Sequence, residues 1–384
     1  MDEKRENTSL NIYLVIFLMC LGVMARFGVM CLGHNFDFES YEVVGEIVAR
    51  GDNVYAETTR YNYGFIFSLI QGLGYKLTSY LENSESAYRA YITTLITMTD
   101  IGIALWIMKR YSKKAAILFF LNPISIVITG YHNQFDNMAV LAALISIDYY
   151  DENDALTKKD IISIICLTIS LITKHILYLF WGWILFNQAP KNRIKKMVYV
   201  CAPPILFVFS FIPFMLEKNA RCGIVNNVFL YRSYNNFPLL SPILNMLSIP
   251  ENCFFLIYVA LVLVLGVIVR KKNYEEIVLI YFAAMVAFSS AIANQYLIIP
   301  MTTLAVCRKK FFYWAYTVSG SIYILFNGNG LHLGYLIKDK FPACEEWIKK
   351  VTETGGCIIT WMMLVLVMYI LWQIRYDKKN CNTI

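Results

Sequence analysis

The chain alternates between apolar stretches and short polar connections. A helix that crosses a bilayer needs about 17–25 mostly apolar residues. We therefore expect the longer stretches to span a membrane, and the shorter ones to be extended by flanking residues or buried by their neighbours. The expected spans are residues 11–31, 88–108, 115–130, 136–149, 160–173, 175–187, 196–215, 252–270, 274–290, 295–307, 311–327 and 356–375. This pattern predicts an all-α polytopic membrane protein of about twelve transmembrane helices, forming a single domain over residues 1–384 with no soluble domain.

Two further helices are expected in the first long connection, residues 32–87, along the membrane surface. In residues 37–50 the two faces differ in character, with Phe38, Tyr41, Val44 and Val48 on one face and Glu39, Glu42, Glu46 and Arg50 on the other. This spacing indicates an amphipathic helix that is broken at GDN (51–53). Residues 61–77 are interrupted by polar and small residues, so we interpret them as a second interfacial helix rather than a span.

The distribution of charge predicts the sidedness of the chain. With both termini in the cytoplasm, the loops expected to face inward hold 21 of the 34 basic residues. Basic residues are concentrated on the cytoplasmic side of membrane proteins, so residues 32–87 are expected on the outer side. The net charge of +7 arises from these loops, and it is not interpreted as a nucleic-acid-binding surface. We expect the first span to be a retained anchor, because no small-residue cleavage pattern follows it.

Ten cysteines are scattered along the chain, and most of them lie within expected spans as small apolar packing residues. Cys222 and Cys344 fall in outer loops, and the sequence does not decide whether they pair.

Acidic residues follow the first expected span and precede the fourth. Asp37 and Glu39 lie in HNFDFESY (34–41), and Asp136 lies in GYHNQFDN (130–137). A carboxylate beside a membrane can act as a general base, so these three are the candidate catalytic residues. The alternative is structural, because Asp37 and Asp136 could each cap the N-terminus of the helix that follows.

Other polar residues at the expected outer surface are candidates for substrate binding. Lys174 is a candidate phosphate clamp, although a solubilising lysine in a tight outer turn is the alternative. The full set of binding candidates is Asn62, Tyr63, His132, Gln134, Lys174, His175, Arg232, Gln295 and Tyr296. Ordinary turn or membrane-interface roles also suit Asn62, Tyr63, Arg232, Gln295 and Tyr296. Within the membrane, Asp100 is expected to form a structural ion pair with Arg26 or with another intramembrane group.

The order of these features resembles the GT-C superfamily of integral-membrane glycosyltransferases. DFE (37–39) resembles the acidic motif of that superfamily, and NVYAETTRYNYGFIF (53–67) resembles the stretch that leads to its juxtamembrane helix. NPISIVITGYHNQFDNMAVLAAL (122–144) resembles the corresponding pair of spans. The likeness is greatest to bacterial polyprenyl-phosphate-dependent mannosyl- and glucosyltransferases. The chain lacks the large C-terminal soluble domain of the oligosaccharyltransferase-type members.

The resemblance implies transfer of a hexose from a polyprenyl-phosphate-linked donor to a glycan or glycolipid acceptor on the outer side, with inversion. Asp37 would be the general base, Glu39 and Asp136 would be second choices, and Lys174 with Arg232 would bind the phosphate. We expect no cofactor and no metal, and a bacterial plasma membrane as the location. Two alternatives stay open: a transporter or flippase of lipid-linked sugars, and a non-catalytic component of a polysaccharide assembly complex.

Overall fold

The computed structural model describes residues 10–230, 237–327, 330–331, 333 and 345–381, with side chains described as far as Arg375. Every regular element among these residues is a helix, which confirms the all-α prediction. The α-helices are α1 (Ile12–Met30), α2 (Phe36–Ala49), α3 (Val54–Glu57), α4 (Phe65–Thr78), α5 (Ser84–Arg110), α6 (Lys113–Phe120), α7 (Pro123–Gly130), α8 (Asp136–Tyr149), α9 (Lys158–Thr173), α10 (Phe180–Phe186), α11 (Arg193–Phe209), α12 (Lys218–Gly223), α13 (Leu240–Met246), α14 (Phe254–Ile268), α15 (Tyr274–Ala287), α16 (Met301–Val306), α17 (Lys310–Phe326), α19 (Glu345–Glu353) and α20 (Gly355–Cys381).

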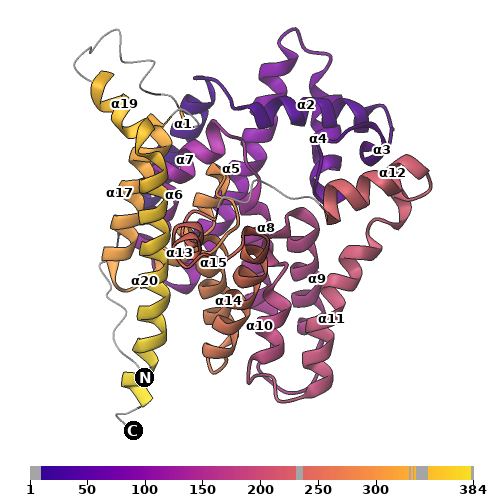
Figure 1. Ribbon diagram of the computed structural model, residues 1–384. Coiled ribbons are helices and arrows are strands. Elements are labelled where there is room, and N and C mark those ends of the chain that lie inside the picture. Colours follow the sequence, from indigo (N-terminus) through magenta and orange to yellow (C-terminus); the bar gives the residue numbers. More distant parts are fainter. Residues whose placement is uncertain (1–9, 231–236, 328–329, 332, 334–344, 382–384) are drawn as a thin grey trace.

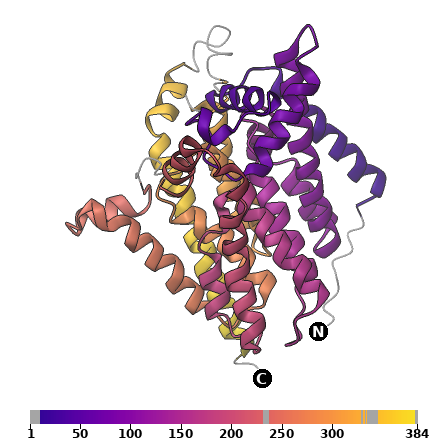
Figure 2. The ribbon, with the colours of Figure 1, turned by 90° about the vertical axis from the view of Figure 1, so that its right-hand side faces the viewer.

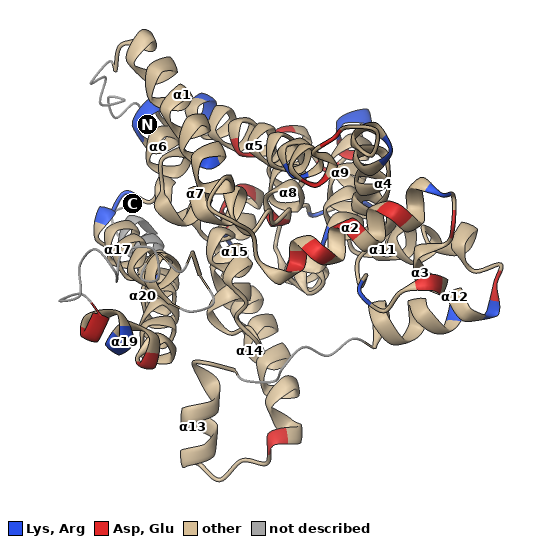
Figure 3. Cartoon of the chain, turned by 90° about the horizontal axis from the view of Figure 1, so that it is seen from above, with Lys and Arg blue, Asp and Glu red and all other residues tan. Residues whose placement is uncertain are grey.

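The two ends of the helix bundle differ in construction. Helices α2, α3, α4 and α12 gather at one end, called here the upper end, while the connection between α10 and α11 lies at the opposite, lower end (Figure 1). Seen from above, α2 crosses the middle of the upper end and carries several acidic residues, whereas α13 lies apart at the edge (Figure 3). The upper end therefore carries the helices of the first long connection.

Helix α2 is amphipathic, as the sequence predicts. Phe38, Tyr41 and Val44 are buried beneath it, while Glu39 and Glu46 are exposed on the other side. The helix ends before Gly51, whose φ of +86° is favourable only for glycine. Helix α4 occupies most of the second segment expected to be interfacial, residues 61–77.

Helices α2 and α4 pack closely because glycines lie where they cross. A Cβ atom on Gly72 would lie 2.4 Å from Cγ1 of Val48, and one on Gly45 would lie 3.1 Å from the backbone oxygen of Gln71. Both distances are shorter than ordinary van der Waals contact, so larger side chains would push the helices apart. This contact fixes α2, and with it the start of the acidic motif, on top of the bundle.

Five helical segments of the described chain are long and apolar enough to cross a membrane. They are residues 12–30, 84–110, 193–214, 251–268 and 355–375, and α6 with α7 would form a sixth, bent span. The first of these, α1, lies at the edge of the bundle and is little buried (Figure 2). The chain is thus a multi-pass membrane protein by composition and helix length, whereas the count of twelve spans stays a prediction.

Three of the expected spans are not continuous helices. Residues 115–130 form α6 and α7, which meet at an angle of 49° where Pro123 starts the second helix. Proline lacks the N–H that a continuing helix needs, so the break falls before it. Residues 175–187 and 295–307 each contain a short 3₁₀ turn followed by a short helix, η1 (His175–Leu177) before α10 and η5 (Asn294–Ile298) before α16.

The main core surrounds α15, in which every residue from Ile277 to Ala287 is buried. A helix that is apolar on all sides is stable only when other helices enclose it. Nearer the upper end, the predicted pair of Arg26 and Asp100 is confirmed, with Nη2 of the arginine 2.9 Å from Oδ2 of the aspartate and both side chains fully buried. This pair joins α1 to α5, and Thr129 on α7 donates to the same aspartate oxygen at 2.7 Å.

The connections that hold the basic residues meet at the lower end. Arg110 at the end of α5 donates a hydrogen bond to Asp148 on α8 at 2.8 Å and is paired with Glu275 on α15. The backbone N–H of Gln188 donates to the carbonyl of Arg270 at 2.8 Å. Loops predicted to share one side of the membrane therefore lie together, opposite α2. That the lower end faces the cytoplasm stays a prediction.

Candidate functional site

A cavity of about 520 Å³ opens at the upper end of the molecule. One wall is formed by His34 to Asp37 at the start of α2 and by Tyr131 and His132 after α7. Residues 292–295, with Tyr323 and Gly330, complete the lining. The cavity thus joins the N-terminal and C-terminal parts of the chain, and it contains both the first acidic motif and Gln295.

Asp37 lies in this wall, and its carboxylate is held by two amides. Asn35 Nδ2 donates to Asp37 Oδ2 at 2.9 Å, and Gln134 Nε2 donates to the same oxygen at 2.6 Å. Asp37 is not the N-cap of α2, because the capping position is Asn35 and Asp37 is the second helical residue. The capping alternative for Asp37 is therefore wrong.

Asp136 forms a buried ion pair instead of capping α8. Its Oδ2 atom lies 2.6 Å from Nζ of Lys174, and the two side chains are 0% and 4% exposed. The capping position of α8 is Phe135, so the capping alternative for Asp136 is wrong as well. The solubilising alternative for Lys174 is also wrong, because its ammonium lies over the rings of Tyr63 and Phe135, at 5.0 and 4.6 Å from their centroids.

Gln134 connects the ion pair with Asp37. Its Oε1 atom lies 3.5 Å from Nζ of Lys174, while its Nε2 atom donates to Asp37. An amide whose oxygen accepts from an ammonium must turn its nitrogen the other way, so the lysine fixes which end of Gln134 faces the carboxylate. Lys174 is consequently linked to Asp37 through one side chain, although it does not line the cavity.

The turn after α7 brings His132 and Gln134 to α2. Asn133 has a φ of +51°, a left-handed conformation that asparagine tolerates better than most residues. Its side chain is buried and donates to Thr93 Oγ1 at 2.7 Å and to the carbonyl of Thr129 at 3.1 Å. Within this turn, His132 Nδ1 is 2.9 Å from Nδ2 of Asn35. The asparagine therefore holds the turn in the shape that lets its two neighbours reach the acidic motif.

The remaining predicted residues are only partly gathered at the cavity. Gln295 lines it, whereas Tyr296 packs against the main core and Glu39 is exposed on α2. Asn62 is half-buried and does not line the cavity. Tyr63 packs edge-on against Phe135, with ring centroids 5.0 Å apart.

His175 packs against Phe207 with ring centroids 5.2 Å apart, and it also does not line the cavity. Arg232 and Cys344 lie outside the described residues. The binding role of Arg232 therefore stays a prediction, as does the question of a pairing between Cys222 and Cys344.

The sequence interpretation missed several residues of the cavity wall. Asn35 was not singled out, although it lies within the same motif as Asp37 and contacts both Asp37 and His132. Asn294, next to Gln295, also lines the cavity. An amide two residues before a candidate base is a signal that could have found Asn35. No local sequence pattern identifies Asn294, because only the tertiary fold brings it to the cavity.

Burial and neighbouring acidic side chains shift the pKa values of two residues on α2. Burial raises the pKa of Tyr41 well above its usual value, and the negative charges of Asp37 and Asp136 add to the effect. Burial also raises the pKa of Glu42, with the charge of Glu85 adding to the shift. The region therefore disfavours further negative charge. Among the described residues, no three His, Cys, Asp or Glu side chains form a cluster that could hold a metal ion.

The fold of the chain is similar to that of one solved structure. The crystal structure of ArnT from Cupriavidus metallidurans in the apo state superposes with a TM-score of 0.51, over 94% of this chain and 76% of the ArnT chain. The sequences are 11% identical, so the likeness is one of fold. Comparison of the sequence with known protein families and with curated proteins finds no match.

Proposed function

We propose that the protein is a membrane glycosyltransferase that takes a sugar from a lipid-linked donor. The donor is a hexose on a polyprenyl phosphate, and the acceptor is a glycan or glycolipid that enters from the upper end, on the non-cytoplasmic side of a bacterial inner membrane. Three lines of support point the same way: the ordered motifs of the sequence, the ArnT-like fold, and a polar cavity at the end where the acidic motif lies.

The arrangement around Asp37 carries the proposal. Asn35 and Gln134 both donate to Oδ2 of Asp37, and the same residue lines the cavity. Two donors on Oδ2 orient the carboxylate and leave Oδ1 for an incoming hydroxyl. A general base must lie within hydrogen-bond reach of the proton that it removes, and an oriented carboxylate in a cavity wall meets that requirement.

The reaction is a single displacement at the anomeric carbon. The acceptor oxygen forms the new bond to that carbon, and its proton passes to Asp37. The bond from the same carbon to the phosphate oxygen breaks, and the electron pair leaves with the polyprenyl phosphate. Attack opposite the leaving group inverts the anomeric centre. Of the described residues that line the cavity, Asp37 is the one carboxylate, which suits this scheme better than the paired carboxylates of glycosidases.

The leaving phosphate needs positive charge more than it needs a general acid. Lys174 is already paired with Asp136 and lies behind Gln134. We therefore assign Lys174 to positioning Gln134 and Asp37 rather than to the phosphate. His132, which lines the cavity, and Arg232 are the residues we assign to the phosphate, and Gln295 together with Asn294 is assigned to the sugar hydroxyls.

The test is sugar transfer in membranes that contain the full-length protein. Radiolabelled polyprenyl-phosphate glucose and polyprenyl-phosphate mannose are supplied separately, and both the released lipid and the labelled product are measured. Asp37→Asn should reduce transfer at least a hundredfold, because the amide cannot take the proton. Glu46→Gln, an equal loss of charge on the exposed face of the same helix, is the matched control.

Each outcome bears on a different part of the proposal. Full transfer by Asp37→Asn removes Asp37 as the base. Movement of the labelled lipid across the membrane without release of polyprenyl phosphate supports the transporter alternative. Altered partner association in alanine variants of Asp37 and Asp136, with unchanged donor consumption, supports the scaffold alternative. Consumption of neither donor by the parent protein removes the hexose assignment.

A further inference from the structure

A second cavity lies at the lower end, far from Asp37. It has a volume of about 560 Å³ and is formed by the loop after α8, the loop between α10 and α11, and the turn before α15. None of the residues in its wall belongs to the candidate catalytic or substrate-binding set. The three loops come from separate parts of the chain, so only the fold brings them together.

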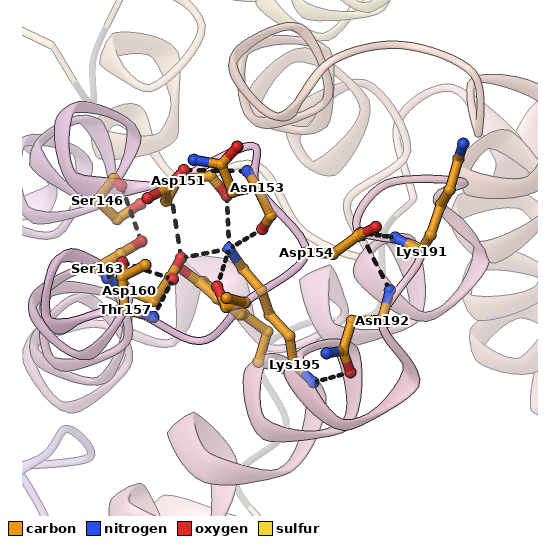
Figure 4. A network of polar contacts seen from close by, with 12 residues as sticks. Ser146, Asp151, Asn153, Asp154, Thr157, Asp160, Ser163, Lys191, Asn192 and Lys195 are labelled. Carbon is orange, nitrogen blue, oxygen red and sulfur yellow. Dashed lines mark hydrogen bonds and ion pairs between the residues drawn. The ribbon is translucent and has the colours of Figure 1, made fainter.

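Hydrogen bonds between these loops give the cavity a fixed shape. Asn187 Nδ2 donates to the carbonyl of Lys272 at 2.9 Å, which ties the α10–α11 loop to the turn before α15. The backbone N–H groups of Lys191 and Asn192 donate to Oδ1 of Asp154 at 2.9 and 3.2 Å, which ties it to the loop after α8. Figure 4 shows the bonds from Lys191 and Asn192 to Asp154, together with the network beside them.

A buried lysine holds the loop after α8 from beneath. Lys195 pairs with Asp160 at 2.9 Å, and both side chains are 0% exposed. Its ammonium also donates to the carbonyls of Asp151 and Asn153, at 2.6 and 2.8 Å. Burying an ammonium is unfavourable unless all its hydrogens find acceptors. The network therefore fixes the backbone of this loop, which forms one wall of the cavity.

The rim of the cavity presents cations that the fold does not neutralise. Lys191 and Lys271 come from different loops, both are exposed, and within the described part of the chain neither ammonium forms an ion pair. The side chain of Lys191 extends away from the bonded network (Figure 4). The acidic residues of the wall are Glu152 and Asp154, and the carboxylate of Asp154 is already bound by two backbone N–H groups.

The interior of the cavity suits a hydroxylated group attached to an anion. Tyr150 and Tyr274 stack in its lining with ring centroids 4.1 Å apart, and Asn153, Gln188 and Asn273 supply amides. Polar side chains of this kind bind hydroxyl groups, while the two lysines at the rim attract a phosphate.

Exposed apolar residues close in sequence to the cavity lining indicate the source of the anion. Phe186 at the end of α10 is 38% exposed, and Ile194 in the first turn of α11 is 72% exposed. Large apolar side chains near two unpaired lysines at the end of a membrane helix fit the boundary between acyl chains and headgroups. A soluble phosphate ester has no acyl chain that could contact these apolar side chains.

We propose that this cavity binds the phosphodiester headgroup of an anionic phospholipid whose headgroup carries hydroxyls, in the leaflet that borders the lower end. Lys191 and Lys271 contact the phosphate, the amides of the wall contact the headgroup hydroxyls, and Phe186 with Ile194 contacts the acyl chains. The site is separate from the upper cavity and does not depend on the glycosyltransferase proposal.

The test is native mass spectrometry of the full-length protein in detergent, titrated with dioleoyl phosphatidylglycerol or, as a neutral lipid, dioleoyl phosphatidylcholine. The variant Lys191→Gln with Lys271→Gln should bind phosphatidylglycerol about thirtyfold more weakly, because each of the two lysines near an anionic headgroup contributes about 1 kcal/mol. The matched control is Lys158→Gln with Lys159→Gln, two exposed lysines at the same end that do not line the cavity. A third variant, Gln188→Trp, fills the cavity without changing its charge and should also weaken binding.

The outcomes distinguish a structured lipid-binding site from non-specific electrostatic attraction of anionic lipid to a basic surface. Equal weakening by both lysine pairs, with no effect of Gln188→Trp, means that any basic surface suffices and overturns the proposal. Binding of phosphatidylcholine as tight as that of phosphatidylglycerol overturns it too. Glycerol 1-phosphate is then titrated in a thermal-shift assay without lipid. If it stabilises the protein and this effect depends on Lys191 and Lys271, the ligand is a soluble phosphate ester and the lipid proposal is overturned. Size-exclusion profiles check that each variant is folded.

Discussion

Replacing Lys174 by methionine tests the buried ion pair behind the candidate base. Nζ of Lys174 lies 2.6 Å from Oδ2 of Asp136, and the exposed fractions of the side chains are 4% and 0%. At an effective dielectric constant of about 20, two charges at this distance attract by about 6 kcal/mol. Most of that attraction offsets the desolvation of the two groups, so it is not the net stability of the pair.

The cost of removing one partner is larger than the net contribution of the pair. Lys174→Met leaves the Asp136 carboxylate buried without its cation, and we expect the free energy of unfolding to fall by about 3–5 kcal/mol. Asp136→Leu should cost a similar amount, because it strands the ammonium. The double variant removes both charges, so it should lie within about 2 kcal/mol of the parent protein. The expected signature is therefore strong coupling between two neighbouring positions.

The measurement is reversible unfolding in mixed micelles with increasing dodecyl sulfate, followed by tryptophan fluorescence. Lys158→Met serves as the control, because that lysine is exposed and should change the unfolding free energy by less than about 0.5 kcal/mol. A Lys174→Met variant within about 1 kcal/mol of the parent would refute the reasoning, as would single effects that simply add in the double variant. Either result would mean that water or another group already neutralises Asp136.

Three further predictions concern the helices of the upper end. Asn35→Ala removes one donor to Asp37, so the turnover rate in the membrane transfer assay should fall about tenfold to a hundredfold, while polyprenyl phosphate retention, measured by mass spectrometry, should not change. Gly72→Val places a side chain against Val48 and should lower the unfolding free energy by about 1–3 kcal/mol in the same micelle assay. The pKa of Glu42 is raised by burial and by Glu85, so its ionisation opposes folding above that pKa. Glu42→Gln should therefore raise the thermal midpoint at pH 7 and not at pH 4, and equal shifts at both pH values would contradict this.

The features that the sequence predicts best are those set by local pattern. The apolar stripe of Phe38, Tyr41 and Val44 predicts helix α2 and its buried face, because helical periodicity needs no knowledge of the partner. The pairing of Arg26 with Asp100 is also predicted, since two opposite charges within apolar stretches have few other partners.

The sequence interpretation fails where long-range packing decides the outcome. The segment 115–130 has the composition of one span, and the bend at Pro123 follows from a backbone rule that composition does not show. The sequence places Lys174 in an outer turn, yet its ammonium is buried over Tyr63 and Phe135. Tyr63 lies just before α4, which packs beneath α2, so the burial of the lysine depends on a contact across more than a hundred residues.

Three ion pairs in the described part of the chain have both side chains buried, and two of them lie next to a cavity. Arg26 with Asp100 joins α1 to α5, Lys174 with Asp136 lies behind the upper cavity, and Lys195 with Asp160 lies beneath the lower one. A buried pair adds little net stability compared with apolar residues of the same size. We infer that the second and third pairs are present because a charged group fixes the direction of its hydrogen-bonding neighbours, Gln134 in one case and the carbonyls of residues 151–155 in the other. Apolar replacements of each pair should then keep the fold while loosening the adjacent cavity, which would separate the structural role of the pair from its role at the site.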